Sequence, residues 1–286
     1  MIASAALIGF GEVGSIFARD LATAGVRDLR AYDTADRAMP DTVRRCASMD
    51  AATDGAELVV SAVTAGSDLA VAEAARALSH APFFLDVNSV APATKQRAAA
   101  IVAQKGGRYV EAAVMASVPP KGLGSPMLLG GDHADAFIAA AEGLGMDLVA
   151  FSPEIGRASS VKMCRSVMIK GLEALTTECL LAARYYGVET EVLASLADTL
   201  PHPDWPGLAR YMIGRALVHG VRRAEEVREV AVTVRDAGVE PWLSAPTAVR
   251  QDWAAAIGRA LPRVTRDEAD LPTLLDAMRT ASQKGT

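Results

Sequence analysis

Four polar side chains recur every three or four residues along an otherwise apolar segment: Lys162, Arg165, Ser166 and Lys170. This spacing places them on one face of an α-helix, where like charges repel each other. A positioned amine can take a proton from a hydroxyl group and return it, and burial beside other cations brings the pKa of an amine toward neutrality. The pattern therefore indicates an acid–base site, with a solvated basic face as the alternative.

A glycine-rich motif near the N-terminus is the most specific local signal: Gly9-Phe10-Gly11-Glu12-Val13-Gly14. This complete G-x-G-x-x-G follows the first expected strand, 5–9, and opens the first expected helix, 15–24. In such a turn the first glycine bends the chain, the second admits a pyrophosphate, and the third lets the helix pack closely on the strand. We therefore expect a dinucleotide site built on the helix N-terminus, with an unliganded glycine turn as the alternative.

The ends of later strands supply the other predicted cofactor residues. Asp33 ends the second expected strand, roughly 20 residues beyond the motif, where a carboxylate accepts hydrogen bonds from the adenosine ribose. A carboxylate there would repel a 2′-phosphate, so we favour NAD, although Arg37 leaves NADP open. Ligands of parallel sheets lie beyond the carboxyl ends of the strands. This rule adds Ala62, Val63, Thr64 and Asn88, with helix capping as the alternative for Asn88.

Expected strands and helices, which must position these groups, alternate through the first half of the chain. Strands are expected at 28–33, 58–63, 83–87, 108–115, 126–129 and 147–151, and helices at 68–79, 92–104 and from about 132. From residue 156 onward only helical patterns occur, at 158–186, 189–196, 207–218, 222–237 and 242–260. The predicted fold is therefore α/β: a Rossmann domain with a doubly wound parallel sheet over residues 1–155, followed by an all-α domain over residues 156–286.

The composition narrows the range of partners. The 286 residues carry a formal net charge of −5, which argues against nucleic acid and anionic membrane surfaces as partners. No segment has the long uncharged apolar run of a membrane span, and the N-terminus lacks the charged region of a signal peptide. The three cysteines, at no metal or redox spacing, fit a reducing cytoplasm. No cluster has metal-ligand spacing, so we expect a metal-free reaction.

Together these features resemble the β-hydroxyacid dehydrogenase superfamily, which includes 3-hydroxyisobutyrate and 6-phosphogluconate dehydrogenases. The resemblance covers nearly the whole chain and rests on the glycine motif, the strand end at 86–89, the loop at 111–131 and the helix at 156–171. Residues 219–226 resemble a phosphogluconate-dehydrogenase-like subgroup with a C-terminal domain of unknown function. The resemblance implies that Lys162, six residues after a helix-opening glycine, is the general acid/base. It also implies a homodimer formed through the helical domain.

The sequence departs from this family where the substrate would bind. Ser166 stands where the family usually has asparagine, and Arg165 stands where asparagine or histidine is usual. The family's Ser-Gly-Gly loop is replaced by residues 117–121, whose two prolines remove two backbone donors. A carboxylate would therefore be held differently, and a bulky or aromatic substrate would be admitted. The predicted substrate-binding residues are Ser117, Lys121, Arg165, Ser166 and Lys170.

The function that these features predict is NAD(P)-dependent hydride transfer between a nicotinamide and a β-hydroxy acid or a related alcohol. An imine reductase has the same architecture, but such enzymes generally lack the lysine, so Lys162 favours a hydroxyl or carbonyl substrate. The alternative from a different class of function is a non-catalytic NAD sensor. Such a sensor would use its helical domain to bind a partner.

Overall fold

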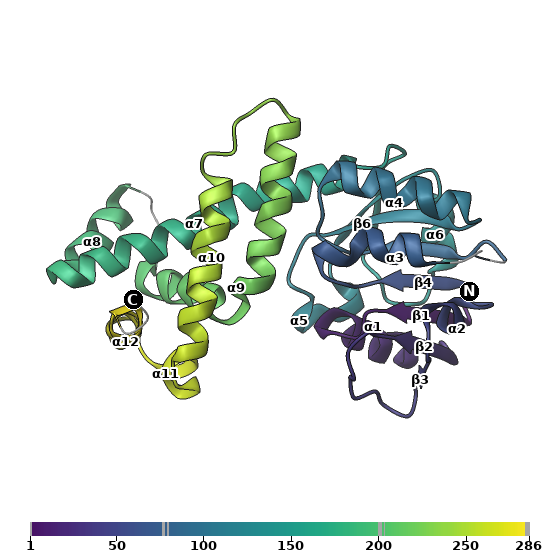
Figure 1. Ribbon diagram of the computed structural model, residues 1–286, viewed down its shortest axis with the longest axis horizontal. Coiled ribbons are helices and arrows are strands. Elements are labelled where there is room, and N and C mark those ends of the chain that lie inside the picture. The colour runs from purple at the N-terminus through teal and green to yellow at the C-terminus, as the bar shows by residue number, and fades with distance from the viewer. Residues whose placement is uncertain (1, 76–77, 79, 200–201, 203, 284–286) are drawn as a thin grey trace. The chain divides into compact units, whose positions relative to one another are not determined.

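The computed structural model describes residues 2–75, 78, 80–199, 202 and 204–283 (Figure 1). The chain divides into two compact units, Met1–Cys164 and Arg165–Thr286. The division falls inside one long helix, α7 (Arg157–Tyr186), so the first turns of α7 belong to the first unit and the rest to the second. The boundary predicted after residue 155 stands just before this helix.

Within the described residues, the first unit is built on one sheet in the order β3-β2-β1-β4-β5-β6-β7-β8. The strands are β1 (Ser4–Ile8), β2 (Asp28–Tyr32), β3 (Arg44–Arg45), β4 (Leu58–Ser61), β5 (Phe83–Asp86), β6 (Arg108–Val114), β7 (Met127–Gly130) and β8 (Leu148–Ser152). All neighbours are parallel except β6 and β7, which are antiparallel. The predicted doubly wound Rossmann sheet is confirmed, with one antiparallel connection and a short edge strand, β3, that the sequence did not indicate.

The pleat of the strands distributes apolar side chains to both faces, so the sheet needs helices on each side. On one face, Ala5 and Leu7 of β1 pack in a core with α1 (Glu12–Thr23) and α6 (Ala134–Ala140). On the other face, Ala6 and Ile8 pack in a core with α2 (Met49–Thr53), α3 (Asp68–Ala74) and α4 (Pro92–Gln104). Three short segments complete the unit: η1 (Ala65–Ser67), α5 (Val118–Lys121) and η2 (Gly122–Gly124).

The second unit is entirely helical in the part of it that is described, as predicted. After α7 come α8 (Glu189–Thr199), α9 (Trp205–Asp236), α10 (Ser244–Ala260), α11 (Arg263–Glu268) and α12 (Leu271–Gln283). Its core joins Leu180 of α7 and Ile213 of α9 to Leu274 and Leu275 of α12. No helix among the described residues is long and apolar enough to cross a membrane.

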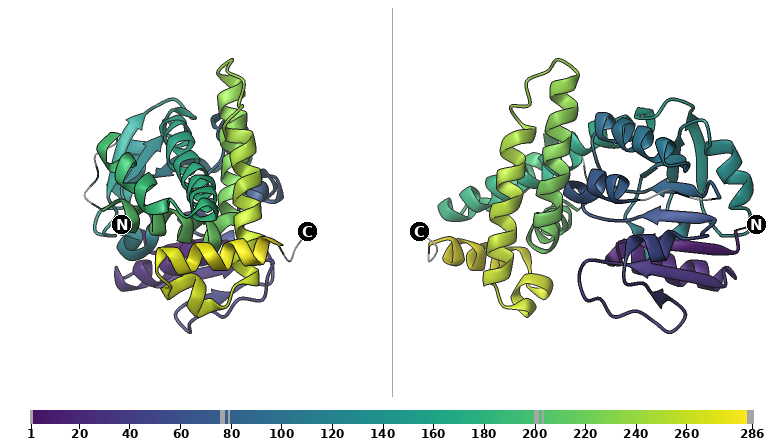
Figure 2. Two further views of the ribbon diagram at one scale, coloured as in Figure 1. Left: turned by 90° about the vertical axis from the view of Figure 1, so that its left-hand side faces the viewer. Right: turned by 45° about the vertical axis from the view of Figure 1, so that its right-hand side comes forward.

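The expected helices at 207–218 and 222–237 are a single helix, α9, so the predicted break near Gly220 was wrong. Figures 1 and 2 show α9 and α10 lying side by side. A Cβ atom at Gly220 would overlap the carbonyl oxygen of Gln251, and one at Gly258 would overlap the carbonyl oxygen of Leu217. These glycines permit a close approach of two helices, which is a reason for glycine that differs from helix termination.

Candidate cofactor site and active site

The three glycines of the motif occupy three different environments at the end of β1. Gly9 has a φ of +91°, and a Cβ atom there would overlap the carbonyl oxygen of Ala62. A Cβ atom at Gly14 would overlap the carbonyl oxygen of Gly9, whereas one at Gly11 would meet no atom within 4 Å. Gly9 therefore makes the turn, Gly14 permits close helix packing, and Gly11 faces open space at the N-terminus of α1. This geometry fits a bound pyrophosphate.

Alanine at Gly14 and alanine at Gly11 should therefore have different effects. We expect Gly14→Ala to displace the loop, to lower stability by about 1–3 kcal/mol and to weaken NADH binding by roughly 100-fold. Gly11→Ala should leave the melting temperature unchanged and still weaken NADH binding, because its methyl group occupies the open space. Fluorescence titration and thermal melting measure the two effects. Wild-type affinity in Gly11→Ala would contradict this placement of the pyrophosphate.

Asp33 ties the end of β2 to the glycine loop. Its Oδ2 accepts a hydrogen bond from the backbone N–H of Phe10 at 2.7 Å, and its Oδ1 accepts one from Ala35 at 2.8 Å. Carboxylate oxygens have further lone pairs, so the half-buried Asp33 retains acceptor capacity for a ribose hydroxyl. Glu12 is exposed in the first turn of α1, so the motif offers its backbone N–H groups, not this carboxylate, to an anion.

The loop at the end of β4, residues 62–64, is held by Asn88. The Oδ1 of Asn88 accepts a hydrogen bond from the backbone N–H of Val63 at 2.7 Å. Its Nδ2 donates to Ser61 Oγ at 2.9 Å and to Asp68 Oδ1 at 2.6 Å. Asn88 is buried, and the helix-capping alternative is wrong because Ala91 is the N-cap residue of α4. The structure thus brings Asn88 to the cofactor loop, with its amide bonded to protein groups.

A buried acid pair lies behind Asn88. Asp86 Oδ1 pairs with Lys95 Nζ at 2.7 Å, and Asp86 Oδ2 accepts a hydrogen bond from the Tyr109 hydroxyl at 2.6 Å. Burial, followed by the charge of Asp86, raises the pKa of Asp68 to about 7. The groups come from α3, β5, α4 and β6. Their distance in the sequence explains why no local pattern revealed the cluster.

Lys162 stands on a helix whose beginning is fixed to the sheet. The fully buried carboxylate of Glu111 on β6 accepts hydrogen bonds from the backbone N–H groups of Gly156 at 2.7 Å and Ser159 at 2.6 Å. The side chain of Gln96 on α4 donates to the carbonyl oxygen of Ile155 at 3.1 Å. Lys162 lies just beyond the first turn of α7 and is half-buried. The first unit therefore holds the backbone near Lys162 rigidly, and this capping role of Glu111 was not visible in the sequence.

The loop that contains Ser117 and Lys121 is attached to α1. Both side chains are exposed, and Ser117 is the N-cap residue of α5. The backbone N–H of Leu123 donates to Asp20 Oδ2 at 3.0 Å. Gly122 has a φ of +57°, and a Cβ atom there would overlap this carboxylate. Asp20 thereby anchors the loop to the helix that begins at the glycine motif.

The predicted polar side chains that α7 contributes to the second unit differ in exposure and in their partners. Arg165 is exposed, whereas Ser166 and Lys170 are buried. Lys170 Nζ pairs with Glu226 at 2.8 Å and donates to Ser166 Oγ at 3.3 Å. Burial lowers the pKa of Lys170, and the charge of Glu226 opposes that shift. Lys170 therefore has a partner inside the helical unit, and its predicted contact with substrate stays a prediction.

Glu173 organises a second buried network in the helical unit. Its carboxylate accepts hydrogen bonds from Arg223 Nε at 2.7 Å and Gln251 Nε2 at 3.3 Å, and Arg215 Nε lies 3.7 Å away. Arg223 is 4% exposed and bonded to Glu173. Within the described residues, no group of three or more His, Cys, Asp and Glu side chains could hold a metal ion.

The fold and the glycine-loop geometry define a Rossmann-type NAD(P)-binding protein of the oxidoreductase class. Residues 4–144 match the NAD binding domain of 6-phosphogluconate dehydrogenase, and residues 183–264 match a domain of unknown function, DUF1932. The chain belongs to the family that joins these two domains within the β-hydroxyacid dehydrogenases, which confirms the resemblance seen in the sequence.

Solved structures support this assignment over nearly the whole chain. A conserved hypothetical protein from Sinorhizobium meliloti is 34% identical, with 98% of this chain and 97% of that chain covered and a TM-score of 0.73. The conserved protein MTH1747, described as structurally similar to 3-hydroxyacid dehydrogenases, is 28% identical, with 90% and 98% covered and a TM-score of 0.67. The 3-hydroxyisobutyrate dehydrogenase of Mycobacterium tuberculosis shares the fold, with 18% identity, 98% and 99% covered and a TM-score of 0.63.

Proposed function

We propose that this protein is an NAD(P)-dependent dehydrogenase that acts on the CH–OH group of a β-hydroxy acid or a related bulky or aromatic alcohol. The observation that carries the proposal is the placement of Lys162 on a helix start that Glu111 and Gln96 fix to the Rossmann unit. A bound nicotinamide would supply the acceptor for the hydride of the substrate carbon. The neutral amine of Lys162 takes the hydroxyl proton in oxidation, and its ammonium form returns that proton in reduction.

The remaining site residues have binding roles in this proposal. The backbone of Gly9 to Gly14 binds the pyrophosphate, Asp33 the adenosine ribose, and residues 62–64 the nicotinamide half of the cofactor. The exposed side chains of Ser117, Lys121 and Arg165 bind the substrate, with the guanidinium suited to a carboxylate. Ser166 and Lys170 are buried, and Lys170 pairs with Glu226 of α9. We therefore assign them the role of holding α7 in position against α9.

A cofactor and substrate panel tests the proposal. Purified protein is assayed with NAD and NADP against β-hydroxy acids and aryl alcohols, and with NADH and NADPH against the corresponding carbonyl compounds and against imines. We expect turnover of a hydroxyl or carbonyl substrate, with NAD preferred because of the carboxylate of Asp33. Turnover of imines alone would favour the imine reductase alternative. Cofactor binding without turnover across the panel would favour the sensor.

A reducing cytoplasm is the compartment we propose for this reaction. The three cysteines, Cys46, Cys164 and Cys179, are all free, and Cys164 and Cys179 are exposed. Exposed free thiols persist where thiols are kept reduced.

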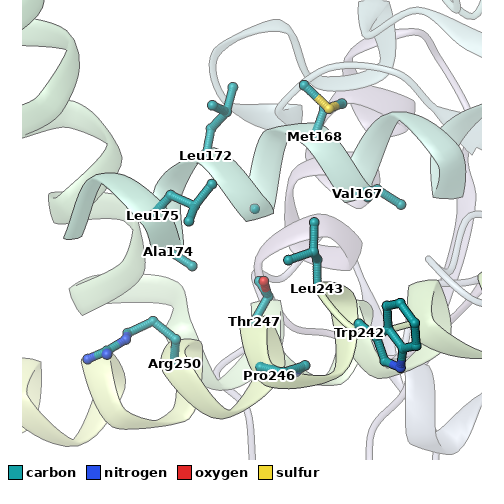
Figure 3. Close-up of a pocket in the computed structure, with 11 residues that line it drawn as sticks. Val167, Met168, Leu172, Ala174, Leu175, Trp242, Leu243, Pro246, Thr247 and Arg250 are labelled. Carbon is teal, nitrogen blue, oxygen red and sulfur yellow. The ribbon is translucent and has the colours of Figure 1, made fainter. Parts of the chain in front are cut away.

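We also propose that the helical unit forms a homodimer. Large apolar side chains of α7 and of the residues before α10 are exposed around a groove of about 210 Å³, among them Met168, Leu172, Leu175, Trp242 and Leu243 (Figure 3). Tyr185, Tyr186 and Tyr211 add further exposed aromatic surface to the same unit. Exposed apolar patches of this kind mark protein interfaces, and a two-fold dimer is the commonest assembly.

The dimer can be tested by changing the groove. We expect Leu175→Glu to convert a dimer into a monomer in light scattering, because a charge would be buried in the interface. Val264→Glu is the matched control, since Val264 is also exposed but lies on α11, away from the groove. A wild-type protein that is monomeric at micromolar concentration would contradict the proposal.

A further inference from the structure

We propose that Asn88 and Asp68 are positioning residues for the cofactor loop, residues 62–64, and that the loop binds the cofactor most tightly while Asp68 carries a proton. This inference rests on the proposed function, because it takes the loop to bind NAD(P). The sequence indicated Asn88 as a direct contact, whereas the structure places it behind the loop, where it acts through the backbone of Val63.

The hydrogen bonds of Asn88 determine which way its amide faces. Its oxygen accepts from the backbone N–H of Val63, and its nitrogen donates both protons, to Ser61 and Asp68. A reversed amide would set a donor against the N–H of Val63 and an acceptor against Asp68. The acceptor on Asp68 therefore selects the orientation that holds Val63.

Val63 in turn lies against the glycine motif. Its Cγ1 would be 2.9 Å from a Cβ atom at Gly9, and the neighbouring N–H of Ala62 donates to the carbonyl oxygen of Ile8 at 2.8 Å. Any displacement of the loop is therefore transmitted to the turn that would receive the pyrophosphate. This contact explains how a buried amide could control cofactor affinity without touching the cofactor.

The proton belongs on Asp68 because Asp86 is held as a carboxylate. Asp86 accepts from Lys95, from Tyr109 and from the backbone N–H of Asn88, which is 3.0 Å away. Asp68 Oδ2 is buried and receives no hydrogen bond from any described residue. A buried oxygen without a donor, on a carboxyl group whose pKa the charge of Asp86 raises, is the natural position of the proton.

The charged and titratable groups around Asp68 come from every element packed on it. Asp86 of β5 raises the pKa of Asp68, Lys95 of α4 lowers it, and Tyr109 and Glu111 of β6 interact with the same cluster. With that pKa at about 7, the proton is lost as the pH rises through neutrality. The carboxylate of Asp68, at the start of α3, and the carboxylate of Asp86, at the end of β5, then repel each other close to the cofactor loop.

The sign of the stability change follows from the raised pKa. Between an ordinary aspartate pKa of 3.8 and about 7, the folded protein binds this proton and the unfolded chain does not. Stability therefore decreases as pH rises through this window. Above the window, Asp68 causes no further change of stability with pH. Asp68→Asn removes the titration, because its amide is neutral at every pH, accepts from Asn88 and donates to Asp86.

Binding of NADH, measured by fluorescence titration between pH 6 and pH 9, tests the proposal. In the wild type we expect the dissociation constant to rise on the order of tenfold, which corresponds to a one-unit difference in the pKa of Asp68 between bound and free protein. In Asp68→Asn the dissociation constant should stay near the low-pH wild-type value. Asp135→Asn is the matched control, since Asp135 is an exposed acid in the first turn of α6 and should keep the wild-type profile.

Asn88→Asp gives an independent readout. It retains the size and one acceptor for Val63, but it removes both donors from Ser61 and Asp68, so we expect an affinity loss of at least about tenfold at pH 7.5. Wild-type affinity that does not vary with pH, or an Asp68→Asn profile identical to the wild type, would refute the positioning role alone. Failure to bind NADH and NADPH at every pH would refute the proposed function as well.

Discussion

Lys162→Ala should reduce kcat by about 10³-fold while leaving the dissociation constant for NADH within about twofold of the wild type, because a positioned acid/base contributes 10²–10⁴-fold to a proton transfer. The structure supports this separation of effects. Lys162 lies on α7, whereas the glycine loop, Asp33 and residues 62–64 lie at the ends of β1, β2 and β4. The measurements are steady-state kinetics on the active substrate and fluorescence titration of NADH.

Lys162→Arg is the matched variant for this prediction. Arginine keeps the positive charge but does not lose its proton at working pH, so it can bind an anion yet cannot act as a base. We expect its turnover to be close to that of Lys162→Ala. Added small primary amines should partly restore the activity of Lys162→Ala, because they can supply the missing base. Turnover within tenfold of the wild type in both variants would remove Lys162 from the mechanism.

Glu173→Ala should lower the free energy of unfolding of the helical unit by about 3–5 kcal/mol, the usual effect of leaving a buried charge without its partner. Arg223 is 4% exposed and has Glu173 as its ion-pair partner, while Arg215 adds a second cation nearby. Removal of the carboxylate would leave the buried guanidinium of Arg223 without its ion-pair partner. Gln251 would also lose an acceptor for its amide.

Tryptophan fluorescence during urea unfolding measures this effect in the appropriate unit. All three tryptophans, at 205, 242 and 253, belong to the second unit. Glu191→Ala on α8 is the matched control, since Glu191 is exposed and its loss should change stability by less than about 0.5 kcal/mol. The double variant Glu173→Leu/Arg223→Met should recover most of the stability, because it removes both charges. A double variant as unstable as Glu173→Ala would show that the loss comes from packing.

The class of fold and the outline of the cofactor site followed from local sequence patterns. A strand, a glycine motif and a helix within about 25 residues, followed by Asp33, specify their own geometry, because each signal acts through neighbouring backbone. The long helix from Arg157 and its termination before Gly187 were equally local, since period and a breaking glycine determine them. Amphipathic spacing at Leu271, Leu274, Leu275 and Met278 was also available, and it was the overlooked signal for α12.

Only the tertiary structure decided how the charged residues are used. Glycine at 220 has the same local preference whether it ends a helix or permits two helices to cross, and the choice depended on Gln251 of α10. Lys170 fitted a solvated face or a substrate site until α9 brought Glu226 beside it, and only the packing of α9 on α7 joins Arg223 to Glu173. The pairing of Asp68 with Asp86 joins elements that are far apart in the chain. Burial and partner choice are long-range properties, because the free energy of a charge depends on groups that sequence spacing does not specify.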